Sequence, residues 1–128
     1  MATTNAIKHN VSLILANGTL DSTEIRPTTD LIDQNTAVPT RAGGNQTIGF
    51  AAHEALVVTG ITTLGWAYFR NRDATNFVEI GVDVAATFYP LIRLNPNEGT
   101  AVRLAQGITV YAQADTAAVV MQREILDD

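Results

Sequence analysis

The sequence predicts an all-β protein folded as an antiparallel β-sandwich, and the form of sandwich that we expect is a jelly roll. Apolar stretches rich in Val, Ile, Thr, Phe and Tyr alternate with polar residues at the period of two that half-buried strands require. Gly, Pro, Asn and Asp separate these stretches at intervals of roughly 8–12 residues. Short strands at that spacing are typical of sandwiches and jelly rolls rather than of a parallel sheet.

The length of 128 residues suits one domain, which can bury most of its apolar surface without disulfides. We therefore expect a single β-sandwich domain over residues 1–128. Residues 1–5 are a candidate N-terminal arm, and residues 27–44 are a candidate long loop or second arm.

The chain opens on a predicted hairpin. Ile7 to Ala16 alternates apolar and polar residues, and Asn17-Gly18 suits a two-residue turn in which both residues adopt positive φ. The returning strand is expected from Thr19 to about Arg26.

The periodic pattern then stops between Pro27 and Gly44, where Thr, Asp, Asn and Pro dominate. Such a segment is either a surface loop or an arm that becomes ordered against a neighbouring subunit. The apolar pair Leu31-Ile32 inside it favours the arm.

Further strands are predicted from Thr47 to Ala52 and from Ala55 to Val58. After them, Leu64 to Asn71 and Asn76 to Val82 read as two strands joined by a turn through Arg72 to Thr75, within "GWAYFRNRDATNFVEIGV".

The aromatic residues of that stretch have two interpretations. Trp66, Tyr68 and Phe77 are predicted to face one another across the antiparallel pair as interior packing, since such contacts contribute roughly 0.5–1.5 kcal/mol beyond burial. Alternatively, Trp66 and Tyr68 form an exposed platform for a sugar ring. We favour interior packing.

The remaining strands are predicted at Thr87 to Leu94, Thr100 to Leu104, Ile108 to Gln113 and Ala117 to Leu126. Both faces of the last strand carry apolar residues. It lies either in the centre of the sandwich or against a subunit interface.

Charge and composition exclude several classes of function. The net charge is −5, the seven arginines are spread singly along the chain, and Lys8 is the one lysine. Because binding to a phosphate backbone requires clustered Lys and Arg, we expect no nucleic-acid binding. Without Cys there is no disulfide or thiolate chemistry. The sequence contains neither a signal peptide nor an apolar run long enough to span a membrane, so we expect a soluble chain without membrane contact.

We expect no catalytic site, metal or cofactor. Gly43-Gly44 lacks the Lys that a phosphate-binding loop requires. His9 reads as a hydrogen-bonded strand residue and His53-Glu54 as a solvated turn. Asp30 and Asp33 lack the alternating acidic ligands of a calcium loop.

Glycoside hydrolysis requires two carboxylates that face each other across a cleft. The only plausible contributors are Glu79, Asp83 and Glu98, and we interpret them instead as surface and turn residues. Ser12 and Ser22 show no recognisable nucleophile arrangement. The protein is predicted not to be an enzyme.

Three pieces of the chain, "GWAYFRNRDATN", "FYP" and "YAQADTAA", resemble a widespread set of short proteins encoded among the virion structural genes of tailed bacteriophages. The resemblance covers about Thr47 to the C-terminus and consists of strand and turn residues. The N-terminal third departs from the pattern, which leaves the role of the arm open. The resemblance implies a non-enzymatic particle component of jelly-roll type.

From the resemblance we expect a protein that decorates or cements the virion head by binding the major capsid protein lattice, as a small homo-oligomer such as a trimer. A tail or head–tail junction component, and a carbohydrate-binding module of a receptor-binding apparatus, are the alternatives. The candidate interaction or structural residues are Leu31, Ile32, Trp66, Tyr68, Phe77 and Tyr111.

Overall fold

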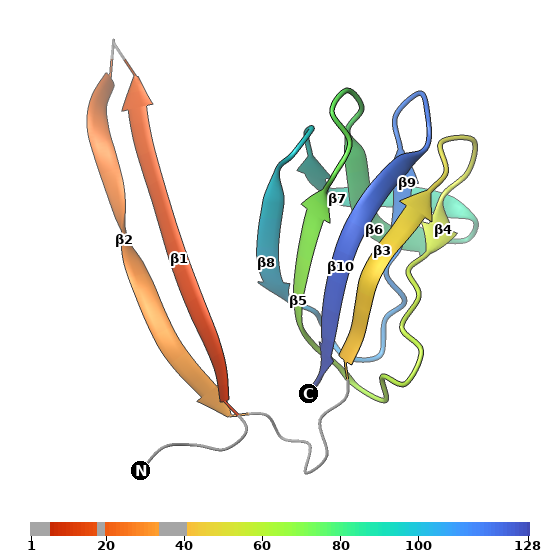
Figure 1. Cartoon of the computed structure of the whole chain (residues 1–128), viewed down its shortest axis with the longest axis horizontal. Helices are drawn as coiled ribbons and strands as arrows, with labels where there is room; N and C mark the ends of the chain where they lie inside the picture. Colours follow the sequence, from red (N-terminus) through yellow and green to blue (C-terminus); the bar gives the residue numbers. More distant parts are fainter. Residues whose placement is uncertain (1–5, 18–19, 34–40) are drawn as a thin grey trace. The chain divides into compact units, whose positions relative to one another are not determined.

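The computed structural model describes residues 6–17, 20–33 and 41–128, and in the first two of these ranges it describes only the backbone. The chain forms two compact units, Met1–Ala37 and Val38–Asp128. Every secondary-structure element of the described residues is a β strand, which confirms the all-β prediction (Figure 1). Within the described ranges, no helix is long and apolar enough to cross a membrane.

The first unit is an antiparallel ribbon of β1 (Ala6–Asn17) and β2 (Leu20–Asp33). Its register runs from the pair Asn17 and Leu20 to the pair Ala6 and Asp33, so the predicted pairing of the first two strands is confirmed. Asn17 is itself a paired residue of β1, so the predicted turn position at Asn17-Gly18 is wrong for Asn17, and Gly18 lies outside the described residues. The register shifts where Arg26-Pro27 lies opposite Ser12. A bulge is one of the few places in a ladder that tolerates proline, because proline has no N–H to donate.

The predicted loop or arm from Pro27 to Gly44 is wrong at both ends. Residues 27–33 continue β2, and residues 41–44 begin β3. The polar stretch of β2 forms a strand because β1 supplies a backbone partner along it, which an apolar pattern cannot reveal. The candidate arm at residues 1–5, and the linking residues 34–40, lie outside the described residues.

The second unit consists of two four-stranded antiparallel sheets, which confirms the predicted sandwich (Figure 1). One sheet has the order β3 (Arg41–Ile48), β10 (Val119–Asp127), β5 (Leu64–Asn71), β8 (Gly99–Arg103). The other has the order β4 (Glu54–Ala55), β9 (Tyr111–Ala114), β6 (Val78–Val84), β7 (Thr87–Leu94). The sandwich is thus built by residues of the second unit, Val38–Asp128. The expectation from the sequence is a single sandwich domain over residues 1–128.

The pairing follows a simple rule. β3 pairs with β10, β4 with β9, β5 with β8 and β6 with β7, so the second half of the unit folds back along the first. The turn between β6 and β7 is the point where the chain reverses, and it joins two strands of the same sheet. Every other connection within the unit crosses from one sheet to the other.

β5 and β6 consequently lie in different sheets, and the predicted pairing of Leu64–Asn71 with Asn76–Val82 is wrong. The turn between them is held by the side chain of Asn71, which is fully buried. Its Nδ2 donates to the carbonyls of Asn76 (2.8 Å) and Leu94 (3.0 Å), and its Oδ1 accepts from the amide of Asp73 (2.8 Å). The backbone amides of Asn76 and Thr75 donate to the Asp73 carboxylate and hold the pKa of that carboxyl below its ordinary value.

The core lies between the sheets. Phe69, Ile48, Met121, Ile125, Val78 and Val119 are its largest fully buried apolar residues. In β10, Val119, Met121 and Ile125 point inward, while Val120 is 41% exposed on the outer face. β10 lies between β3 and β5, so of the two predicted places for the last strand the sandwich centre is confirmed.

The turn at the tip between β6 and β7 places two alanines at positive φ, Ala85 at 52° and Ala86 at 67°. Two-residue turns of this kind strongly favour Asn-Gly, because a Cβ at positive φ meets the following carbonyl. We expect the double substitution Ala85→Asn with Ala86→Gly to raise the free energy of unfolding by about 1 kcal/mol. Urea titration measures the change. Ala117→Gly, at an exposed position with no positive φ, is the control and should give no gain; equal effects of the two changes would contradict this account.

Candidate functional site

Trp66 and Tyr68 lie on the outer face of the β3-β10-β5-β8 sheet, so the prediction that they are interior packing is wrong. Trp66 is half-buried and Tyr68 is 37% exposed, whereas their neighbours Ala67 and Phe69 are buried at 4% and 0%. Both faces of this strand, β5, carry apolar residues, and the alternation in the sequence therefore does not decide which face points into the core. Packing around Phe69 decides it.

Tyr68 has a polar residue on the neighbouring strand on one side and small residues on the neighbouring strand on the other side. Across the strands it pairs with Glu124 and with Ala101. A Cβ on Gly99 would lie 2.9 Å from Tyr68 Oη, so the Tyr68 hydroxyl reaches over that glycine of β8. This arrangement gives the outer face an accessible aromatic ring with a flat, small-residue border.

Phe77 is not part of that group. It lies half-buried just before β6, and the Arg93 guanidinium carbon lies 3.9 Å from its ring centroid. Arg93 also binds the Glu79 carboxylate, with Nη2 3.2 Å from Oε2. Phe77 thus belongs to a cation–π contact on the other sheet.

Tyr111 joins a cluster around His53 that sequence reasoning missed. The His53 ring stacks on Phe88, with centroids 5.3 Å apart, and meets Tyr111 edge-on at 5.4 Å. His53 Nε2 contacts Asp83 Oδ2, and Asp83 Oδ1 accepts the amide of Ala86 at 3.1 Å. The reading of His53 as a solvated turn residue is therefore wrong, since 19% of its side chain is exposed.

No sequence signal could have identified this cluster, because it draws on the loop before β4 and on β6, β7 and β9. Among the side chains that the structure describes, those of residues 41–128, no group of three His, Asp or Glu is placed to hold a metal ion.

The three carboxylates considered for glycoside chemistry have separate partners. Glu79 binds Arg93, Asp83 binds His53, and Glu98 Oε2 accepts the amide of Asn95 at 2.8 Å. Each therefore stabilises its own turn or strand pair rather than facing another across a cleft.

A buried arginine lies between the sheets. Arg123, 8% exposed, points inward from β10 opposite Gly44, and its Nε donates to Gln46 Oε1 at 3.0 Å. Gln46 in turn contacts Glu54 Oε1 at 3.4 Å and accepts the amide of Val57 at 2.9 Å. This chain of polar contacts ties β10 and β3 to β4 and the loop that follows it.

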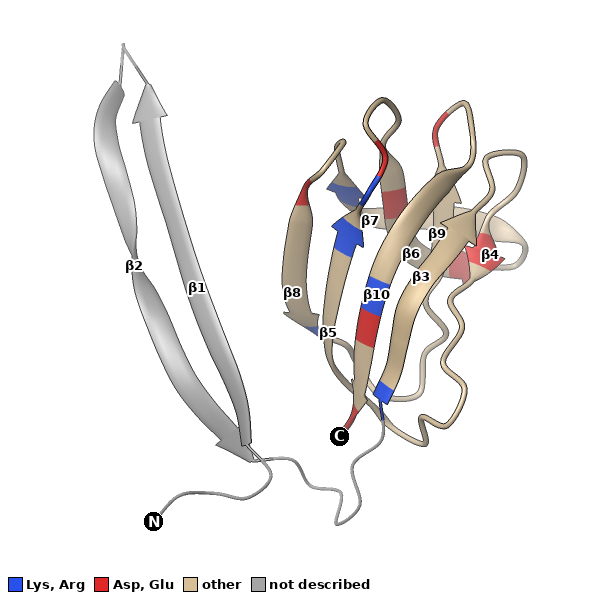
Figure 2. Ribbon diagram, viewed as in Figure 1, with Lys and Arg blue, Asp and Glu red and all other residues tan. Residues whose placement is uncertain are grey.

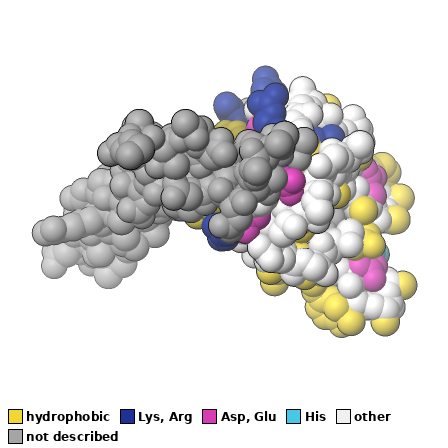
Figure 3. Space-filling model, turned by 90° about the horizontal axis from the view of Figure 1, so that it is seen from below, with side chains coloured by type: hydrophobic (Ala, Val, Ile, Leu, Met, Phe, Trp, Pro, Cys, Tyr) yellow, Lys and Arg dark blue, Asp and Glu magenta, His cyan; other side chains and the backbone are white. Residues whose placement is uncertain are grey.

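The charged residues of the sandwich are scattered, with both signs interspersed (Figure 2). Apolar side chains are exposed on the β6–β7 hairpin and on the loop before β9: Leu91 at 75%, Val84 at 57% and Ile108 at 41%. Ile108 borders hollows that reach both of the other two. Figure 3 shows hydrophobic side chains gathered on part of the surface.

Leu31 and Ile32 fall within β2, where only the backbone is described. The register places Ile32 opposite Ile7 and Leu31 opposite Lys8. Opposite positions in an antiparallel pair share a face, so Leu31 and Ile32 occupy opposite faces of the ribbon.

Comparison with known proteins gives no relative. No protein-family model matches the chain, and searches of curated proteins and of solved structures find no match either.

Proposed function

We propose that this chain is a non-enzymatic structural protein of a tailed-bacteriophage virion, most concretely a decoration protein that binds the major capsid protein lattice as a small homo-oligomer such as a trimer. The observation that carries the proposal is the ribbon of β1 and β2, which forms a unit separate from the sandwich. The proposal also rests on the resemblance of Thr47 to the C-terminus to virion structural proteins.

The strand order supports a jelly roll within this proposal. A jelly roll has eight strands in two sheets and can be described as one long hairpin wound around a core. The pairing of β3 with β10, β4 with β9, β5 with β8 and β6 with β7 is consistent with that arrangement and supports it.

The ribbon supports assembly for a physical reason. A two-stranded ribbon is only marginally stable alone in water. Its register puts several apolar residues on one face, together with the pair His9 and Asp30; the apolar ones are Ile7, Val11, Leu13, Leu15, Ile25 and Ile32. A surface on another copy or on the shell would bury that face, and weak contacts repeated over a symmetric lattice add up through avidity.

A matched pair of variants tests this role. We expect Ile32→Asp to abolish co-sedimentation with capsids that lack this protein and to reduce the oligomer to a monomer in sedimentation experiments, because it replaces the apolar pair of Ile32 and Ile7 with an additional charge beside Asp30. Leu31→Asp, one residue away on the face shared with Lys8, should retain both. Saturable binding of the unmodified chain to the shells is the reference.

Three results would count against the proposal or redirect it. If the unmodified chain does not bind shells, the decoration role is wrong. If it binds purified tails instead, the chain is a tail or head–tail component. If both variants bind as well as the unmodified chain, the ribbon has no part in attachment.

The exposed position of Tyr68 favours a second candidate, a carbohydrate-binding surface. Sugar rings stack on accessible aromatic rings that have polar neighbours, and Tyr68 has Glu124 beside it. A glycan array would test this: binding that is lost in Tyr68→Ala but kept in Phe77→Ala would support it, and absence of any binding by the unmodified chain would exclude it for the glycans on the array.

A further inference from the structure

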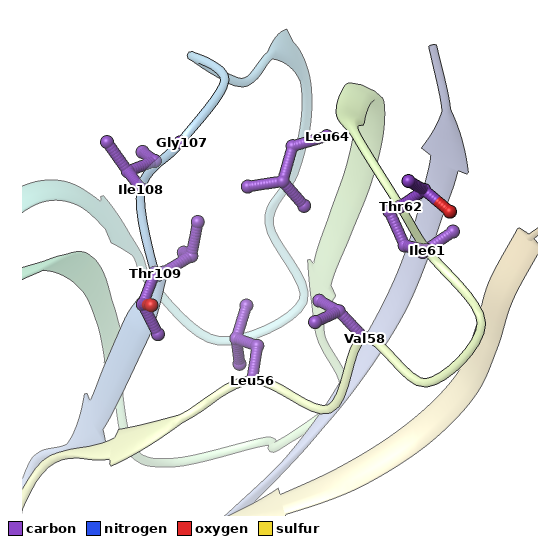
Figure 4. Close-up of a pocket in the computed structure, with 9 residues that line it drawn as sticks. Leu56, Val58, Ile61, Thr62, Leu64, Gly107, Ile108 and Thr109 are labelled. Atoms are coloured by element: carbon purple, nitrogen blue, oxygen red, sulfur yellow. The ribbon is translucent and has the colours of Figure 1, made fainter.

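The sandwich has an apolar pocket at the end where the loop from β4 to β5 faces the loop from β8 to β9 (Figure 4). Its volume is about 180 Å³. The residues that line it are Leu56, Val58, Ile61, Thr62, Leu64, Gly107, Ile108, Thr109 and Val110. None of them is charged, and their only polar side-chain groups are the two threonine hydroxyls.

The floor of the pocket is part of the core. Leu56, Leu64 and Val110 are buried at 4%, 8% and 6%, and Figure 4 shows Leu56 and Leu64 extending into the space from opposite sides. Ile108, 41% exposed, forms part of the wall on the solvent side. An apolar group entering here would therefore contact the hydrophobic core directly.

The walls are held in place by hydrogen bonds that backbone amides donate. The amide of Leu56 donates to the Val110 carbonyl at 2.9 Å, which joins the two loops. The amides of Thr62 and Thr63 donate to Asp127 Oδ1 at 3.1 and 2.8 Å, which fixes one loop to the end of β10. The pocket is thus largely preformed, and a ligand would not need to order the loops when it binds.

We propose that this pocket binds an uncharged apolar group of about the size of a benzene ring or a leucine side chain. An enclosed apolar cavity of about 150 Å³ lined by Leu, Ile and Phe side chains stays dry and takes up benzene. The present pocket has a similar volume and a mostly aliphatic lining, and it differs in being open to solvent and in carrying two threonine hydroxyls. Filling it removes from water the apolar surface that Val58, Ile61 and Ile108 still expose, which favours binding by about 25 cal/mol for each Å² buried. This inference does not depend on the proposed virion role.

The test uses methyl resonances of the full chain in ¹H–¹³C NMR spectra, with benzene as the probe. We expect saturable shifts for the methyl groups that line the pocket, while Met121 in the core and Val120 on the outer face of β10 should not shift. Absence of saturable shifts at the lining methyls would overturn the proposal.

Two neighbouring valines provide a matched control. Val58 lines the pocket, whereas Val57 is 45% exposed and does not. Val58→Phe should fill the space and abolish the benzene-induced shifts, and Val57→Phe should leave them unchanged. Thr109→Leu fills the pocket from the opposite wall and serves as a second test if Val58→Phe does not fold. Retention of the shifts in a folded filling variant would overturn the location.

The apolar group could be a free small molecule or a side chain presented by another chain. N-acetyl-leucinamide distinguishes the two sources. Shifts with this capped leucine as well as with benzene would identify a pocket that accepts a protein side chain, and shifts with benzene alone would identify a small-molecule site. Both results support the proposed chemistry.

Discussion

Replacing Phe69 with alanine should lower the free energy of unfolding by about 3–5 kcal/mol, the usual cost of removing a buried phenylalanine ring. Phe69 is fully buried in the middle of β5, and its removal would leave a cavity between the sheets. A typical domain is stable by about 5–15 kcal/mol, so this variant loses a large part of its stability. Urea or guanidinium titration of the variant and of the unmodified chain measures the difference.

Tyr68→Ala is the matched control, since Tyr68 is adjacent and also aromatic but is 37% exposed on the outer face. Its cost should be about 1 kcal/mol or less. If Tyr68→Ala were as costly as Phe69→Ala, the assignment of the two faces of β5 would be incorrect.

Replacing Asn71 with alanine should cost about 3 kcal/mol, although the side chain is polar. The change leaves the carbonyls of Asn76 and Leu94 and the amide of Asp73 without their partner, in a region where water has little access. A buried polar group left without a partner costs about 1–3 kcal/mol. Thermal unfolding and urea titration should agree on the loss.

Asn45→Ala is the comparison for Asn71, because Asn45 lies exposed on β3. We expect a change within about 0.5 kcal/mol for this variant, as for most surface substitutions. Equal stability of the two variants would show that the Asn71 side chain does not hold the crossing between β5 and β6.

Local patterns were sufficient for the fold class and for most strands. The alternation of Val119, Met121 and Ile125 predicts one inward face of the last strand, and the structure confirms it. The turn signal at Asn17-Gly18 predicts the pairing of the first two strands, which the structure confirms, although Asn17 itself is a paired residue of β1 and not a turn residue. The same rule did not predict the turn at Ala85-Ala86, where the flanking strands impose a conformation that alanine disfavours.

The candidate site residues were less predictable because their environment depends on residues far away in the sequence. Trp66 and Tyr68 follow the same alternation as Ala67 and Phe69, and only the packing of the second sheet selects the pair that is buried. The contact between His53 and Asp83 forms because Asp83 lies on β6, and the turn at Asn71 places β6 in the other sheet from β5.

The sequence by itself thus determined that this chain forms β strands, roughly where most of them lie, and that they make an antiparallel sandwich, because period and turn chemistry are local properties. The tertiary structure alone decided which strands are neighbours, which side of β5 faces the core, and where the two loops leave an apolar pocket. These features depend on contacts between segments distant in the chain, and such contacts are selected by the packing of the whole core.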